Sequence, residues 1–240
     1  MDVVVVLLLG IVAGTVGGVI GFGSSVMLMP ALVILYGPRE AVPVMAVAAI
    51  MANLSRVIVW WREVDWKVCG AYSVTGIPAA ALGAGTLLTI PPRLAEGVLG
   101  IFFLLTLPAR RWMAKRTLHI TLWQMSIVGA LIGYITGIVV STGPINSPFF
   151  LAYGLVKGAY LATEALGSLG LYISKAVTFR SLGALSIEII GKGLLIGSSL
   201  MVGSIVAKRF VLKLEAHQFY RLIEGMLLLS GLTMIWVAVT

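Results

Sequence analysis

The stretch GIVAGTVGGVIGFGSSVMLMP, from Gly10 to Pro30, joins a glycine-rich apolar segment through a polar break to a short second segment. A weaker counterpart near mid-chain, GALIGYITGIVVSTGPINSP, runs from Gly129 to Pro148. Three glycines recur at one constant offset: Gly10, Gly14 and Gly18 correspond to Gly129, Gly133 and Gly137. This recurrence indicates a chain built from two related halves, each with an interrupted apolar segment near its start.

The composition places both halves in a lipid bilayer. Of the 240 residues, 60% are hydrophobic and only 11% are charged, and the mean hydropathy is +1.07. A soluble domain carries roughly 25% charged residues, so this chain cannot present a surface compatible with water. The composition excludes a water-soluble enzyme, a nucleic-acid-binding domain and a disordered tail. The formal net charge of +8 is typical of basic residues held on the cytoplasmic side of a membrane.

The apolar runs predict an all-α integral membrane protein of about ten membrane segments, eight long helices and two short ones. A helix needs about 20 apolar residues to span the hydrocarbon of a bilayer, and most of the runs approach that length. The predicted segments are 3–20, 24–36, 41–61, 68–90, 94–112, 122–140, 147–156, 160–179, 191–207 and 222–239. The short segments, 24–36 and 147–156, each follow a Gly/Ser-rich break.

Further matches extend the duplication along the chain. Leu54 to Trp60 (LSRVIVW) matches Ile173 to Phe179 (ISKAVTF), and Arg93 to Gly97 (RLAEG) matches Arg221 to Gly225 (RLIEG). A repeat of about 110 to 120 residues is a recurrent device of secondary transporters. We therefore predict a first repeat over 1–112, a basic cytoplasmic linker over 113–120 and a second repeat over 121–240.

The distribution of basic residues favours ten segments over eight. With eight spans the Lys and Arg residues divide almost evenly between the two sides. With ten, twelve lie on one side and four on the other, with Lys175 inside the membrane; the four are Arg39, Arg93, Arg180 and Lys192. The positive-inside rule prefers the second distribution. Five elements per half is an odd number, so the repeats are predicted to be inverted, with both termini outside the cytoplasm.

The glycine-rich first segment, its return near mid-chain, the chain length and the duplicated halves resemble the sulfite exporter TauE/SafE family of bacterial membrane transporters. The resemblance covers essentially the whole chain. It implies a protein of the bacterial or archaeal inner membrane that moves small sulfur-containing anions such as sulfite and organosulfonates.

The two breaks are the first candidate binding site. Backbone at membrane depth that is not helical must be buried in protein or line a polar cavity, because lipid cannot satisfy its N–H and C=O groups. Helices that start after each break would direct their positive dipole ends at a bound anion. The candidates are Gly23, Ser24 and Ser25 in the first break and Ser141, Thr142, Asn146 and Ser147 in the second. For Gly10, Gly14, Gly129 and Gly133 we expect close helix packing instead.

Two cations at equivalent positions are the second candidates. Ser55-Arg56 and Ser174-Lys175 lie within predicted segments, where a cation is costly and usually faces a partner, a cavity or a substrate. The alternative is that both side chains reach the interface by snorkelling. Glu164, near the start of segment 160–179, offers a route for proton coupling that the sequence alone does not favour.

No enzyme motif is present in the sequence, which contains neither HExxH, nor a Walker lysine after a glycine loop, nor GxSxG. The single cysteine, Cys69, excludes a Cys-based metal cage. We therefore predict no enzymatic activity, no cofactor and no metal. Without a nucleotide site, transport must draw on an ion or potential gradient.

The predicted function is a secondary transporter, with export the favoured direction, of small anions such as sulfite or an organosulfonate. Its alternating-access site would lie between the inverted repeats. The predicted partners are a small anion and the lipid bilayer, without nucleic acid, and a homodimer is left open. An anion-selective channel is the alternative, and a membrane scaffold or accessory subunit is a third hypothesis that would leave the paired polar breaks unexplained.

Overall fold

The computed structural model describes residues 3–91, 119–139 and 142–210, with isolated positions at 94, 97, 101, 104, 105, 108, 109, 112 and 232. Over these residues every regular element is a helix, which confirms the predicted all-α class. The elements are α1 (Val3–Ile20), α2 (Ser24–Trp60), the short 3-10 helix η1 (Trp61–Glu63), α3 (Trp66–Thr89), α5 (Leu122–Ile138), α6 (Gly143–Ala152), α7 (Lys157–Ser181) and α8 (Ile187–Phe210).

Within the described residues, three helices are long and apolar enough to cross a membrane: Glu40–Glu63, Trp66–Thr89 and Ile187–Ala207. Three shorter apolar helices accompany them: Val4–Val19, Met27–Gly37 and Leu122–Ile138. Helix α7 has 25 residues but carries Glu164 and Lys175 along its length, so its composition is less apolar. The chain is therefore a multi-pass membrane protein whose most polar long helix lies inside it.

Local sequence signals explain several helix boundaries. The Asp65 side chain caps α3 by accepting hydrogen bonds from the main-chain N–H groups of Lys67 (3.0 Å) and Val68 (3.1 Å). Thr121 and Gln124 form a capping box at the start of α5. These caps satisfy amide groups that the first helical turn leaves without a partner.

Two of the predicted boundaries require correction. Segments 24–36 and 41–61 are joined without a loop as α2, which is interrupted only at Gly37, where φ is 71° and ψ is 162°. Glycine adopts this positive φ at little cost, so the chain resumes its helix directly. The second short helix, α6, begins at Gly143 and not at residue 147, because Pro144 suits the first helical turn. The second break is correspondingly shorter than predicted.

The remaining corrections shift the ends of helices, and some predicted segments lie outside the described residues. Helix α6 ends at Ala152, α7 begins at Lys157 and α8 begins at Ile187, each a few residues from the predicted boundary. The predicted segments 94–112 and 222–239, most of the linker 113–120, and Ser141 lie outside the described residues, apart from a few isolated positions.

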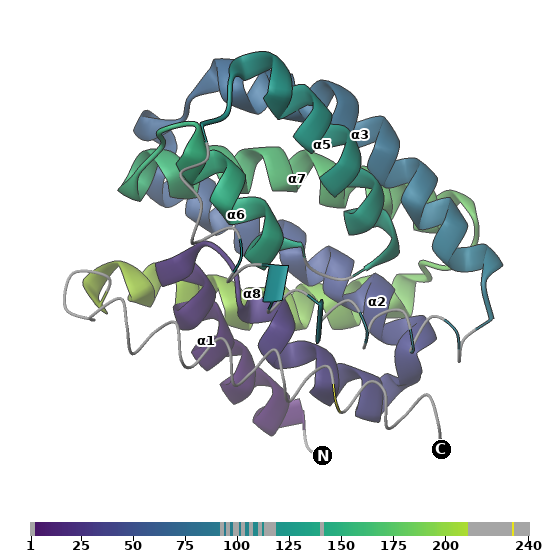
Figure 1. Ribbon diagram of the computed structural model, residues 1–240. Coiled ribbons are helices and arrows are strands. Elements are labelled where there is room, and N and C mark those ends of the chain that lie inside the picture. Colours follow the sequence, from purple (N-terminus) through teal and green to yellow (C-terminus); the bar gives the residue numbers. More distant parts are fainter. Residues whose placement is uncertain are drawn as a thin grey trace.

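The helices pack in a crossed pattern between the two halves of the chain. Helix α1 packs on α8, α5 packs on α3, and α2 and α7 pack on each other in the middle. Figure 1 shows α3 and α5 side by side along the upper part of the molecule and α1 in the lower part, with α7 between them. The first helix of each half thus packs mainly against the last described helix of the other half.

Glycines allow the backbones of these crossed helix pairs to approach each other closely. A methyl group built on Gly14 would overlap the main chain of Leu200, and one on Gly133 would overlap the main chain of Gly76. Helix backbones approach this closely where small residues such as glycine leave room at the contact. The close packing predicted for Gly14 and Gly133 is confirmed.

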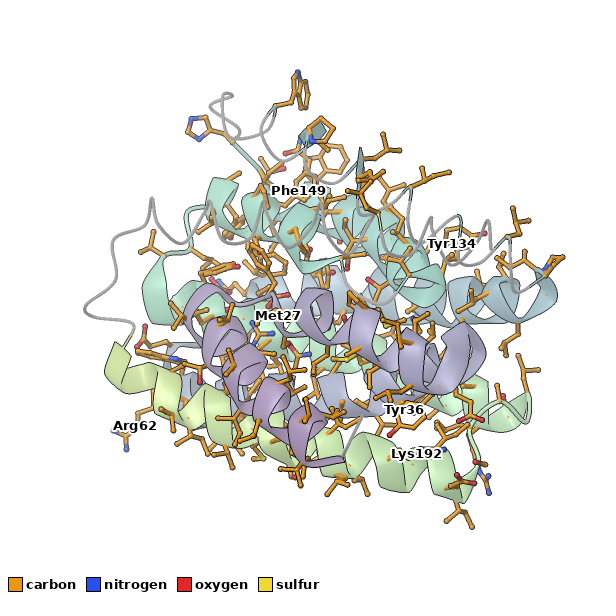
Figure 2. All side chains as sticks on the ribbon, turned by 90° about the horizontal axis from the view of Figure 1, so that it is seen from below. Met27, Tyr36, Arg62, Tyr134, Phe149 and Lys192 are labelled. Atoms are coloured by element: carbon orange, nitrogen blue, oxygen red, sulfur yellow. The ribbon has the colours of Figure 1, made fainter. Side chains whose placement is uncertain are left out.

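Charged side chains mark two opposite ends of the helix bundle. Lys192, on α8, pairs with Glu40 (3.1 Å) and Glu188 (2.7 Å), and its ammonium lies 4.8 Å from the centre of the Tyr36 ring. Figure 2 shows Tyr36 and Lys192 close together at one end and Arg62 projecting away from the other. Because α2 continues from Glu40 to the turn that contains Arg62, these charges bracket the apolar part of the helix.

Candidate functional site

The two polar breaks meet inside the molecule. The Phe22 side chain, in the first break, lies so close to Gly143 at the start of α6 that any side chain at position 143 would overlap it. The first break depends on glycine, because φ is 90° at Gly21 and 113° at Gly23, and side chains larger than hydrogen rarely adopt such angles. Gly21 also leaves room for the Tyr160 hydroxyl and the Arg56 guanidinium.

A cavity lies where the breaks meet. The cavity has a volume of about 30 Å³, which corresponds to about two or three water molecules. Its wall contains the main chain of the first break, the starts of α2 and α6, the Thr142 side chain, and polar side chains from three helices, α2, α7 and α8. The residues that line it are Gly14, Gly17, Gly18, Gly21, Phe22, Gly23, Ser24, Ser25, Ala49, Ala52, Asn53, Arg56, Thr142, Gly143, Glu164, Ser168, Tyr172 and Ser204.

An ion pair forms the charged wall of this cavity. The Arg56 guanidinium donates from Nη1 to Oε2 of Glu164 at 2.8 Å, and from Nη2 to the side-chain oxygen of Asn53. Arg56 is 8% exposed and Glu164 is 2% exposed. Removing two charges from water is costly, and the cost is recovered only when both are paired and hydrogen-bonded. Arg56 and Glu164 therefore hold each other at the cavity.

The other carboxylate oxygen of Glu164 has its own donors. Ser168, one turn further along α7, donates its hydroxyl to Oε1 at 2.7 Å, and the Asn146 amide of α6 donates to the same oxygen at 3.3 Å. The Tyr160 hydroxyl donates to Ser147 Oγ at 2.6 Å, and Ser147 in turn donates to the Gly143 carbonyl at 2.7 Å. This network attaches α6 to α7 and keeps the start of α6 at the cavity.

The structure brings five of the predicted site residues to the cavity wall: Gly23, Ser24, Ser25, Arg56 and Thr142. Asn146 and Ser147 are buried and do not line the cavity: Asn146 donates to Glu164, and Ser147 donates to the carbonyl of Gly143. Ser55 and Ser174 are not at the cavity, because their hydroxyls donate to the main-chain oxygens of Ala52 (2.9 Å) and Ile77 (2.8 Å). Ser141 lies outside the described residues.

Lys175 is buried at a different place from Arg56, its counterpart in the predicted repeats. Its side chain is completely buried, and Nζ donates to the carbonyl oxygens of Thr136 and Val139, both at 2.8 Å. These carbonyls belong to the C-terminal end of α5, where helix carbonyls lack partners and the helix dipole favours a positive charge. Lys175 does not line the cavity. The snorkelling alternative is wrong for both Lys175 and Arg56, since both side chains point into the protein.

Glu164, Asn53 and Ser168 are cavity residues that the sequence reasoning did not select. Glu164 is one of three carboxylates inside predicted segments, and each lies near the start of its segment, which suggested an interfacial position. A buried Arg56 demands an opposite charge, and that requirement was the signal that could have identified Glu164. Among the described residues, no group of three His, Cys, Asp or Glu side chains is placed to hold a metal ion.

The fold and the cavity define a class: a multi-pass membrane protein with a charged, water-sized site buried between interrupted helices. The chain belongs to the sulfite exporter TauE/SafE family, whose model matches residues 6–234, essentially the whole chain. No curated protein and no solved structure matches it. The family resemblance predicted from the glycine-rich segments is confirmed. Membership implies a membrane transporter for sulfite or a related anion, and the family is one of transporters and not of enzymes.

Proposed function

We propose that the protein is a secondary transporter that exports a small anion, sulfite or an organosulfonate, through the cavity at which the two breaks meet. The observation that carries the proposal is the position of Arg56, a buried cation in the wall of a cavity that is also lined by hydroxyl groups. A cation at membrane depth usually faces a partner, a cavity or a substrate, and Arg56 faces the first two.

The anion is proposed to bind to Arg56 and to the starts of α2 and α6. The hydroxyls of Ser24, Ser25 and Thr142 replace part of its water shell. The first residues after Gly23 and Thr142 have no side-chain cap, so the positive ends of both helix dipoles are available to an anion. The guanidinium fork suits a sulfonate or sulfite group, because it donates two parallel hydrogen bonds to two oxygens.

We also propose that the chain is a pair of inverted repeats, 1–112 and 121–240, joined by a cytoplasmic linker, with both termini outside the cytoplasm. The crossed packing of α1 on α8 and of α5 on α3 supports this arrangement, because in each half the first helix packs on a later helix of the other half. Alternating access would follow from movement of the α1–α8 pair against the α3–α5 pair, with the site between them.

The membrane potential supplies a driving force for export. An inside-negative potential favours the exit of an anion by about 2.3 kcal/mol per charge per 100 mV. The wall of the cavity also determines which anions enter it. An oxyanion with three or more oxygens can accept hydrogen bonds from Arg56 and the hydroxyl groups at the same time. A halide is a single spherical acceptor and cannot match the geometry of these donors.

Anion efflux from liposomes tests the proposal. Vesicles loaded with sulfite or a sulfonate should lose it in a saturable manner when they contain the full-length protein. The double substitution Arg56→Gln/Glu164→Gln removes both charges together, so that neither is left buried without its partner. Efflux from vesicles with this variant should fall to that from loaded vesicles without protein. Arg62→Gln, which changes an exposed arginine in η1, just after α2, is the matched control and should transport normally. Undiminished efflux in the double variant, or single-channel current steps, would contradict a carrier that uses Arg56.

A further inference from the structure

The Arg56–Glu164 pair makes the cavity electrically neutral before any substrate arrives. Arg56 Nη1 lies 2.8 Å from Glu164 Oε2, so the group that would recognise the anion is already bound to an internal carboxylate. An anion that binds to Arg56 must compete with Glu164. It also adds a negative charge to a pair that was balanced, at a place where an uncompensated charge is costly.

The two oxygens of the Glu164 carboxylate respond differently when the anion binds the guanidinium. Oε1 keeps its two donors, the Ser168 hydroxyl and the Asn146 amide. Oε2 receives its bond from Arg56, so it is the oxygen that loses its donor when Arg56 turns to the anion. A proton added to Oε2 restores neutrality, because the charges of Arg56 and a monovalent anion then cancel. The side chain stays in place, since Oε1 is still held by α6 and α7.

We infer that Glu164 is the internal competitor of the transported anion, and that binding of the anion to Arg56 is coupled to the uptake of one proton by Glu164. This inference rests on the proposed function and goes beyond it, because it assigns the residue that takes up a proton when the anion binds. By reciprocity, a proton on Glu164 must strengthen anion binding as much as the anion strengthens proton binding.

The surroundings of Glu164 contain no second carboxylate among the described residues that could take its place. The groups that face it are Arg56 from α2, Tyr72 from α3, and Tyr172 from its own helix. From α6 it meets the neutral amide of Asn146, and across the cavity α8 contributes the hydroxyl of Ser204. Glu164 is therefore the acidic group at the cavity wall whose partner an anion would remove.

Calorimetry of the full-length protein in detergent tests the inference. Methanesulfonate, which stays a monoanion across the neutral range, is titrated at one pH into two cationic buffers of different ionisation enthalpy. Neither buffer then competes for an anion site, and the difference in heat gives the number of protons taken up. We expect about one proton per bound anion, and an affinity that falls about tenfold per pH unit over the pH range in which one proton is taken up.

Glu164→Gln should bind methanesulfonate more tightly than the wild type, without proton uptake and without dependence on pH. Glu188→Gln, which changes the exposed carboxylate paired with Lys192 at 2.7 Å, is the matched control and should behave as the wild type does. Binding by the wild type without proton uptake, or uptake that persists in Glu164→Gln, overturns the inference and leaves the proposed function intact. Absence of binding of methanesulfonate, sulfite and sulfate to the wild type overturns both. If Glu164→Gln does not fold, the proton count and pH slope of the wild type decide the question alone.

Discussion

The Phe22 side chain, in the first break, lies directly against the main chain of Gly143, at the start of the helix after the second break. The two breaks are far apart in the sequence, and each would be a weak point in an apolar segment by itself. In contact, they bury each other's main chain and enclose the cavity that contains Arg56. Non-helical backbone at membrane depth is tolerated where protein covers it in this way.

Substitution of Gly143 should therefore disturb the site. In Gly143→Ala the added methyl group overlaps Phe22, so the two breaks must separate. Overpacking of this kind costs about 1–3 kcal/mol, and we expect lower thermal stability together with weaker binding of methanesulfonate. Gly191→Ala, at a helical glycine of α8 with open space around it, is the control and should change neither property for the worse. Unchanged anion affinity in a folded Gly143→Ala protein would contradict the role of this contact.

Two neighbouring glycines of α3 should respond to alanine in opposite directions. At Gly83 a methyl group would overlap the main chain of Tyr134 on α5, whereas at Gly85 it meets nothing within 4 Å. We expect Gly83→Ala to lower stability by about 1–3 kcal/mol through overpacking. Gly85→Ala should raise it by about 0.4–1 kcal/mol, since alanine restricts the unfolded chain and favours a helix. Midpoints of thermal unfolding in one detergent provide the comparison, and equal midpoints for both variants would be evidence against close α3–α5 packing.

Lys175 is expected to support the site without contacting the substrate. In Lys175→Met the carbonyl oxygens of Thr136 and Val139 lose a donor, and a buried carbonyl without a partner costs about 1–3 kcal/mol. The variant should unfold at a lower temperature but bind anions with nearly wild-type affinity while folded. Lys192→Met, at the partly exposed ion pair with Glu40, should have a much smaller effect on stability. A stable Lys175→Met protein that no longer binds anions would show that Lys175 touches the substrate instead.

The proposed topology predicts that Arg62 and Lys192 face opposite sides of the membrane. In a Cys69→Ala background, which removes the single cysteine, one new cysteine is placed at position 62 or at position 192. A membrane-impermeant thiol reagent applied to intact cells should label position 192, and it should label position 62 only after the membrane is opened. Labelling of both positions from outside would contradict the assignment of basic residues to the cytoplasmic side.

The helical class and the polar breaks could be predicted from the sequence because both are local. Apolar length predicts a membrane helix, and glycine next to serine in an apolar run indicates an interruption. The second break is shorter than predicted, because Pro144 suits a first helical turn and α6 therefore starts at Gly143. The sequence predicted two separate helices around Gly37, but a single glycine can kink a helix without ending it.

The partners of the two buried cations could not be predicted, because they depend on contacts between distant segments. Arg56 and Lys175 occupy equivalent positions in the predicted repeats, and the sequence suggested equivalent roles. In the structure Arg56 faces a carboxylate at the cavity, whereas Lys175 caps the end of α5. The difference lies in the groups that the neighbouring helices present: a side-chain carboxylate to Arg56, and main-chain carbonyls at a helix end to Lys175. No periodicity along one stretch of sequence carries that information.

The crossed pairing of helices has a consequence for biogenesis. Helix α1 leaves the ribosome before α8, yet the surface that buries its glycine Gly14 is supplied by Leu200 of α8. Until α8 has been inserted, the nascent α1 carries an uncovered stripe of small residues in the lipid. The amino-terminal half produced alone should therefore remain an incomplete intermediate, exposed to quality-control proteases, and co-synthesis of the carboxy-terminal half as a separate polypeptide should rescue it.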